Sequence, residues 1–150
     1  MTVVAWDGKT LAADRLGVMV GGVKSVTSKI FRLPNGTILA GTGCCSGLIA
    51  LRSWFAEGAI PEHWPKSQDD DDTLASLMVV HPDGRCVTYE SLPLPILVED
   101  PFMAWGSGGP LALGAMAMGA DARQAVEVAC RYSTTCGLGF DAFDVLPGRL

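Results

Sequence analysis

The chain has 150 residues, of which 49% are hydrophobic and 18% are charged, and its formal net charge is −5. This composition is typical of a folded domain long enough to bury a core, and we expect one domain over residues 1–150. The acidic balance argues against nucleic-acid binding, because no basic face is available to neutralise phosphates. No uncharged apolar run is long enough to span a membrane, and charged residues interrupt the N-terminus before a signal peptide could form.

The five cysteines are an odd number without a secretory context, so we expect reduced thiols, mostly in the core of a cytoplasmic protein. Their spacing contains no CxxC pair, and neither His63 nor His81 is placed to complete a zinc site. We therefore predict neither a metal nor a cofactor.

The N-terminal residues predict a β-hairpin. Two short apolar runs, 3–6 and 10–13, flank the dipeptide Asp7-Gly8, and glycine supplies the positive φ that a primed turn requires. Thr2 is small enough for Met1 to be removed before it. A terminal threonine carries a hydroxyl and an α-amine of ordinary pKa about 7.7–8.0, which can act as its base. The alternative is that Thr2 is an ordinary strand residue.

Further strands are predicted after the hairpin. Residues 17–22 are rich in glycine and valine and are interpreted as a strand with a bend. Residues 29–33 and 37–41 are predicted to be strands, because Pro34-Asn35-Gly36 between them is a typical turn sequence.

A helix is predicted over residues 44–57, with an apolar face at helical spacing formed by Leu48, Leu51, Trp54 and Phe55. Cys44 and Cys45 lie at its start, where a thiolate would be stabilised. The sequence offers no histidine as a base for these cysteines, so a core position is favoured over a cysteine nucleophile. Residues 58–72 are interpreted as a solvated loop, and the acidic run 69–72 is expected to be solvated rather than to bind a metal.

The second half of the chain predicts four strands, at residues 74–81, 85–90, 102–105 and 140–146. Two helices are predicted, at residues 110–119 and 121–132, with Asp121 as the N-cap of the second. The buried stripe of that second helix is expected to consist of Ala125, Val126, Val128 and Ala129. Strands outnumber helices and are joined as hairpins, which favours an α+β fold of two mainly antiparallel sheets with helices on their outer faces.

The glycine-rich segment 106–109 lies between a predicted strand and a predicted helix. It could hold a phosphate at the helix N-terminus, but it lacks the endings of the P-loop and of the dinucleotide-binding fingerprint. We interpret it as a tight turn that allows a close approach to another part of the chain.

Three segments, taken in order, resemble proteasome β-type subunits and the HslV-like peptidases of bacteria and phages. They are DGKTLAAD (7–14), KIFRLPNGTILAGTG (29–43) and WGSGGPLALGAMAMGAD (105–121). The resemblance implies an N-terminal-nucleophile hydrolase with a four-layer αββα sandwich, acting as a threonine endopeptidase on peptides or unfolded proteins. It also implies a homo-oligomeric ring or double ring and an ATP-dependent unfoldase as partner.

The resemblance further implies a set of catalytic residues. Thr2 is the expected nucleophile after removal of Met1. Lys29, oriented by Asp14, is the expected cation beside it. The amide of Gly43 is expected to help form the oxyanion hole, and Ser107 is expected near the threonine amine.

Two departures from the family bear on the expected assembly and activity. The second long helix of the family has no counterpart after the helix predicted over 44–57. Ser133 and Cys136 are the nearest equivalents of an aspartate and a serine that proteasome subunits carry near the active site. Two other functions therefore stay open: a catalytically silent ring-forming or binding homologue, and an amidohydrolase acting on a small amide.

Overall fold

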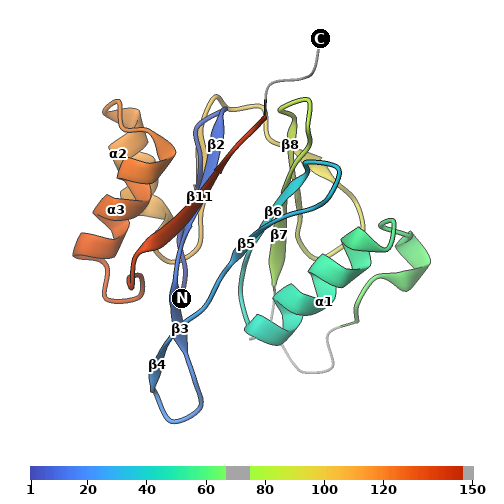
Figure 1. Cartoon of the computed structure of the whole chain (residues 1–150), viewed down its shortest axis with the longest axis horizontal. Coiled ribbons are helices and arrows are strands. Elements are labelled where there is room, and N and C mark those ends of the chain that lie inside the picture. Colours follow the sequence, from blue (N-terminus) through green and yellow to red (C-terminus); the bar gives the residue numbers. More distant parts are fainter. Residues whose placement is uncertain (67–74, 147–150) are drawn as a thin grey trace.

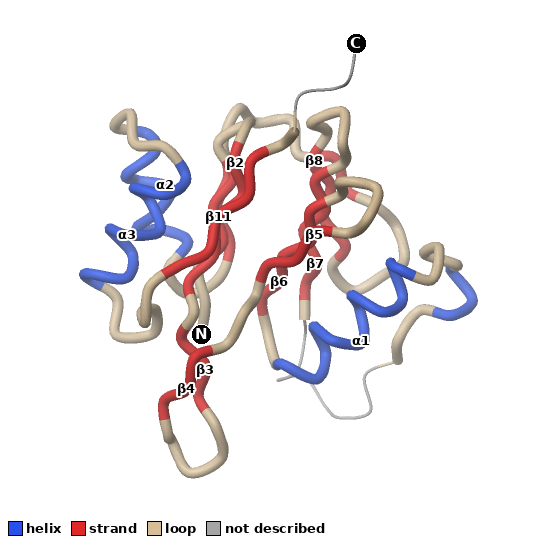
Figure 2. The backbone as a smooth tube through the Cα atoms, in the orientation of Figure 1, coloured by secondary structure: helices blue, strands red, loops and turns tan. Residues whose placement is uncertain are grey.

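The computed structural model describes residues 1–66 and 75–146. Four layers are visible in Figures 1 and 2. Helices α2 (Gly109–Ala117) and α3 (Ala122–Tyr132) cover one sheet, a second sheet packs against the first, and α1 (Cys45–Ala56) covers the outer face of the second. The predicted αββα sandwich is confirmed.

The first sheet contains the N-terminal hairpin at its centre. Its strands are β1 (Val4–Trp6), β2 (Thr10–Asp14), β10 (Met103–Trp105) and β11 (Phe140–Asp144), in the order β10-β1-β2-β11. All neighbours are antiparallel, and Val4 pairs with Trp105 on one side and with Ala13 on the other. The N-terminus is therefore held between two strands, next to the segment that follows β10.

The turn of this hairpin forms as the sequence predicts. Gly8 has φ +88°, a positive value that glycine adopts without steric cost. The carboxylate of Asp7 accepts hydrogen bonds from the amides of Lys9 (2.9 Å) and Thr10 (2.7 Å). Its other oxygen accepts from the amide of Ala122 (2.8 Å), which ties the start of α3 to the hairpin.

The second sheet has the order β5-β6-β7-β8-β9 and is also antiparallel. Its strands are β5 (Ile30–Arg32), β6 (Ile38–Thr42), β7 (Ser76–Val80), β8 (Cys86–Tyr89) and β9 (Ile96–Leu97). The first four agree with the prediction. Strand β9 was not predicted, because it is only two residues long, exposed and preceded by prolines at 93 and 95.

A projecting hairpin replaces the predicted bent strand at residues 17–22. It consists of β3 (Leu16–Val18) and β4 (Lys24–Val26), which pair with each other and extend below the sandwich in Figure 1. Gly21 and Gly22 have φ +85° and +78° and form its tip. The two glycines thus reverse the chain instead of bending one strand.

The helix α1 begins after Cys44, its N-cap, and buries Leu51 and Trp54 against the second sheet. A 3₁₀ turn at Pro61–His63 follows. Between α1 and α2, the residues that the structure describes contain no other α-helix, in agreement with the expected loss of one long helix. The acidic run 69–72 lies outside the described residues.

The helix α3 has a complete capping box, because the side chains of Asp121 and Gln124 each accept a hydrogen bond from the backbone amide of the other residue. Its buried stripe differs by one residue from the prediction: Val128 is only half-buried, and Ala122 is fully buried instead. Residues 122, 125, 126 and 129 follow the 3.6-residue period more closely than a stripe that includes 128.

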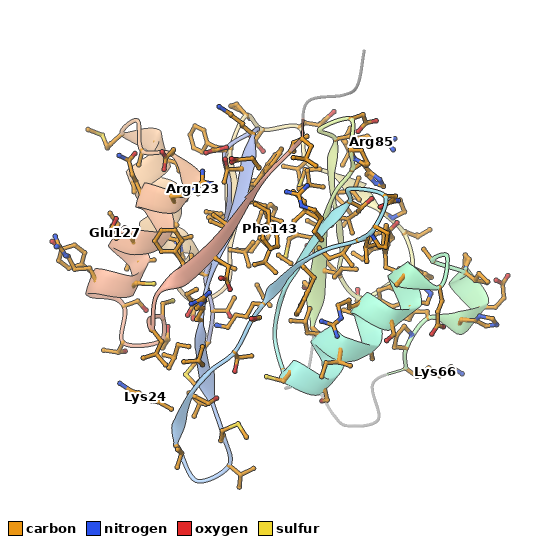
Figure 3. The ribbon with its side chains drawn as sticks, viewed as in Figure 1. Lys24, Lys66, Arg85, Arg123, Glu127 and Phe143 are labelled. Atoms are coloured by element: carbon orange, nitrogen blue, oxygen red, sulfur yellow. The ribbon has the colours of Figure 1, made fainter. Side chains whose placement is uncertain are left out.

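The core lies in three clusters: between the sheets, under α1, and under α2 and α3. Figure 3 shows Phe143 pointing from β11 into the space between the sheets, where it packs against the central cluster. Lys24, Arg85 and Glu127 lie at the periphery in the same view. No helix within the described residues is long and apolar enough to cross a bilayer.

Candidate active site

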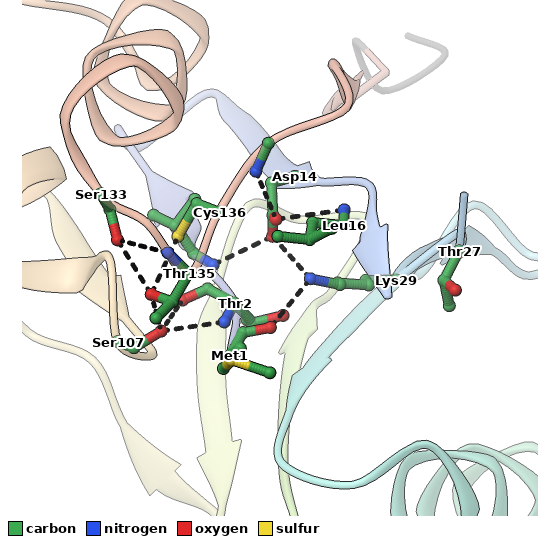
Figure 4. Close-up of polar contacts among 12 residues, drawn as sticks. Met1, Thr2, Asp14, Leu16, Thr27, Lys29, Ser107, Ser133, Thr135 and Cys136 are labelled. Carbon is green, nitrogen blue, oxygen red and sulfur yellow. Dashed lines mark hydrogen bonds and ion pairs between the residues drawn. The ribbon is translucent and has the colours of Figure 1, made fainter. Parts of the chain in front are cut away.

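Thr2 lies where the N-terminal strand meets the glycine-rich turn after β10 (Figure 4). It is buried, and its backbone nitrogen donates a hydrogen bond to the hydroxyl of Ser107 (3.1 Å). Its carbonyl accepts from the amide of Gly108 (3.0 Å) and the hydroxyl of Ser107 (3.3 Å). A Cβ on Gly106 would lie 2.3 Å from this carbonyl oxygen, so glycine is required there. The turn therefore makes the close approach that the sequence predicts.

Lys29 and Asp14 form a buried ion pair beside Thr2. The Lys29 ammonium donates to Oδ1 of Asp14 at 2.7 Å, and it also donates to the carbonyl of Met1 at 3.2 Å. Both side chains are almost fully buried. The two side chains therefore form a core ion pair and not a surface one.

Asp14 is held by three backbone amides in addition to Lys29. Its Oδ1 accepts from Val3 (3.1 Å), and its Oδ2 accepts from Leu16 (3.2 Å) and Gly137 (3.1 Å). A buried carboxylate with this many donors has its charge well compensated. The aspartate thus fixes the position of the Lys29 ammonium and joins three chain segments at one point.

Gly43 follows β6 and precedes α1. It has φ +102°, which favours glycine at this position. It lies on the wall of a cavity of about 490 Å³ that Thr2 and Lys29 also line. The structure therefore brings Thr2, Lys29 and Gly43 to one cavity, with Asp14 and Ser107 in direct contact with that group.

The cavity lies between the N-terminus, the β3–β4 hairpin, β5 and the first two turns of α1. Cys45, Ile49 and Arg52 line it from α1, and Phe31 lines it from β5. The spacing of the three α1 residues places them on one face of the helix. Next to Thr2 the structure therefore has a cavity whose wall is mostly apolar.

Thr135 is the residue of this site that the sequence did not predict. Its hydroxyl lies 2.8 Å from the hydroxyl of Ser107 and 2.8 Å from that of Ser133, so it links the two. Cys136 is buried, with its sulfur against Gly108. The only signal in the sequence was the hydroxyl-rich segment 133–135, because spacing along the chain does not reveal which of these residues faces the glycine-rich turn.

The cysteines agree only partly with the prediction of core positions. Cys86 and Cys136 are buried, but Cys44 is half-buried and Cys45 is exposed. Burial raises the pKa of Cys86 to about 12. Hydrogen bonds from Ser46 and from the amide of Gly47 lower the pKa of Cys44. The expected core position of this neighbouring pair is wrong, because Cys44 caps α1 through its sulfur.

Met1 determines the chemical state of the site. With Met1 in place the nitrogen of Thr2 is an amide, which cannot accept a proton as a base. Met1 is 58% exposed, whereas Thr2 is 3% exposed. Met1 is thus accessible, and its removal would convert the nitrogen beside Ser107 into an amine.

No family model matches the sequence, and no curated protein matches it either. Solved structures do match. BPH of Thiobacillus denitrificans is 25% identical over 99% of this chain and 100% of its own, with a TM-score of 0.70. HslV of Trypanosoma brucei is 20% identical over 95% of this chain and 97% of its own, with a TM-score of 0.69. Anbu of Hyphomicrobium sp. strain MC1 is 14% identical over 96% of this chain and 81% of its own, with a TM-score of 0.69. The chain therefore has the proteasome-like fold of the N-terminal-nucleophile hydrolases.

Proposed function

We propose that this protein is a threonine endopeptidase whose nucleophile is the hydroxyl of Thr2 after removal of Met1. The observation that carries the proposal is the position of Thr2. Its nitrogen contacts Ser107, the buried Lys29–Asp14 pair lies beside it, and Thr2 and Lys29 line one cavity that has Gly43 on its wall. An ordinary strand residue does not need a buried ammonium next to it.

Each residue has a distinct role in the proposed reaction. The freed α-amine takes the proton of the Thr2 hydroxyl, directly or through a water, as the oxygen attacks the peptide carbonyl. The Lys29 cation stabilises the developing alkoxide, and Asp14 keeps Lys29 charged and in place. Ser107 orients the amine. The amide of Gly43 donates to the oxyanion, a contact worth about 3 kcal/mol in comparable hydrolases.

The bond changes balance without any cofactor. Collapse of the tetrahedral intermediate breaks the C–N bond, and the proton held by the α-amine passes to the leaving amine. The acyl group remains as an ester on Thr2. Water then attacks this ester, which releases the carboxylate product and restores the hydroxyl.

The comparisons support this proposal without identifying a substrate. BPH of Thiobacillus denitrificans has also been solved in complex with epoxomicin, at 24% identity and a TM-score of 0.71 to this chain. We propose peptides or unfolded proteins as substrates, which enter the 490 Å³ cavity in extended form. A cytoplasmic location and an ATP-dependent unfoldase as partner belong to the same proposal.

We propose further that the chain assembles into a ring or double ring. Helix α2 contains no charged residue, yet Leu111 and Leu113 are partly exposed on it, and Met118, just after it, is 89% exposed. A helix that is apolar on all sides is normally buried. Contact with a second copy of the chain would bury this surface.

Cleavage of a fluorogenic peptide by the processed protein tests the proposed activity. Thr2→Ala should abolish turnover, because it removes the nucleophile, whereas Thr2→Ser keeps both hydroxyl and amine and should retain part of it. Equal turnover by the wild type and Thr2→Ala would contradict the proposal.

A further inference from the structure

One positively charged side chain in the cavity is not used by the proposed mechanism. Arg52, at the end of the second turn of α1, lines the cavity together with Phe31. Its guanidinium carbon lies 4.0 Å from the centroid of the Phe31 ring. Such stacking holds the planar cation in place and leaves the N–H groups at its edge directed away from the ring.

The charges around Arg52 are unbalanced. The two cationic side chains that line the cavity are Lys29 and Arg52, and none of the described lining residues is an aspartate or glutamate. Lys29 is already paired with Asp14 at 2.7 Å. Within residues 1–66 and 75–146, Arg52 makes no hydrogen bond or ion pair, and its guanidinium stacks on the Phe31 ring. The half-buried guanidinium therefore offers unused donors inside a pocket.

Strand β5 and the residue before it, Lys29, connect the position of Arg52 to that of Thr2. Lys29 and Phe31 are two residues apart, so their side chains point to the same side and are separated by about 7 Å. Lys29 lies beside Thr2, and Arg52 stacks on Phe31. Arg52 therefore lines the same cavity as Thr2, and the Lys29–Phe31 spacing separates the two along its wall.

We propose that Arg52 makes this cavity selective for an acidic side chain, glutamate above all, on the substrate residue whose carbonyl Thr2 attacks. A guanidinium edge matches a carboxylate with two parallel N–H···O bonds. The apolar wall formed by Phe31, Leu48 and Ile49 accommodates the methylene groups of glutamate. This inference rests on the proposed function in one respect: attack by Thr2 determines which substrate residue lies next to Arg52.

Binding to the Thr2→Ala variant tests the inference without catalysis. The probes are two fluorescein-labelled tripeptide amides, Leu-Leu-Glu and Leu-Leu-Gln, which differ only in the charge of the last side chain. We expect the glutamate peptide to bind about tenfold more tightly, because Arg52 forms a stronger hydrogen bond with a carboxylate than with a neutral amide. Partial exposure of Arg52 to water limits this gain. Fluorescence anisotropy measures both affinities.

Substitution of Arg52 provides the matched controls. Arg52→Gln, made in the same Thr2→Ala background, should abolish the preference, and Arg52→Lys should retain part of it, because a lysine keeps the charge without the planar edge. Circular dichroism establishes that each variant is folded. Equal affinity of the two peptides for Thr2→Ala, or a preference that survives Arg52→Gln, would overturn the inference. Failure of the wild type to cleave any peptide would instead overturn the proposed function, and the binding ratio would still decide the role of Arg52.

Discussion

At the scale of single residues, the Lys29–Asp14 pair dominates the energetics of the site. Two opposite charges have been removed from water. The free-energy cost of their desolvation is offset by the 2.7 Å contact between them and by the three backbone amides that donate to Asp14. Removing one partner leaves the other charge buried and uncompensated, which costs about 3–5 kcal/mol. The pair is therefore a structural requirement as well as a candidate catalytic element.

A double-mutant cycle tests this argument. Lys29→Met should lower the free energy of unfolding by about 3 kcal/mol, because it leaves the Asp14 carboxylate unpaired in the core. Asp14→Asn combined with Lys29→Met should cost clearly less than the sum of the single changes, since no charge then remains buried. Urea unfolding of the four proteins measures the coupling. Strict additivity would show that the two charges do not depend on each other.

Thr135 supplies the second prediction at this scale. Thr135→Val removes the hydroxyl that links Ser107 to Ser133, and Ser107 is the residue in contact with the Thr2 nitrogen. We expect kcat to fall about fivefold, the equivalent of one hydrogen bond of about 1 kcal/mol, with little change in KM. Thr135→Ser keeps the hydroxyl and should stay near wild type. An unchanged kcat in the valine variant would show that the Thr135 hydroxyl does not contribute to catalysis.

At the scale of elements, the N-terminal ends of the helices connect the outer layers to the sheets. The Asp121 carboxylate accepts from the amide of Gln124 at 2.8 Å, at the start of the helix that buries Ala125, Val126 and Ala129 against the first sheet. Asp121→Ala should therefore lower the free energy of unfolding by about 1 kcal/mol. Gln124→Ala, which removes only the reciprocal bond, should cost less. Thermal unfolding compares the two, and an equal or larger loss in Gln124→Ala would contradict this ranking.

Most elements could be predicted because local chemistry determines them. Asp7-Gly8, Pro34-Asn35-Gly36 and the Asp121 cap each act within a few residues, and each formed as predicted. The β3–β4 hairpin and β9 could not be predicted. The first depends on how the chain reverses at Gly21-Gly22, and the second on pairing with β8 rather than on its own sequence.

The site could be predicted only where a motif fixes a residue. The chemistry of a terminal threonine predicts Thr2, the family resemblance predicts Asp14, Lys29, Gly43 and Ser107 as well, and the fold brings the five together. Thr135 and Arg52 have no such motif. Their places depend on long-range packing of the turn after α3 and of α1, which sequence spacing does not encode.

At the scale of the whole molecule, the exposed apolar surface predicts self-association. Val20 is fully exposed at the tip of the projecting hairpin, and Met118 is 89% exposed at the end of α2. Patches of this kind on a folded chain mark contact surfaces. We expect native mass spectrometry to show a closed oligomer, and Val20→Glu with Met118→Glu to shift it toward monomers. A wild-type monomer at micromolar concentration would contradict ring assembly.

The central claim is that Thr2 becomes an N-terminal nucleophile. The most direct test is the intact mass of the purified chain before and after reaction with a peptide epoxyketone, a probe that requires both the amine and the hydroxyl of a terminal threonine. We predict loss of Met1 and one adduct per chain, with no adduct on Thr2→Ala. A chain that keeps Met1 and forms no adduct would contradict the claim and favour a catalytically silent homologue with the same fold.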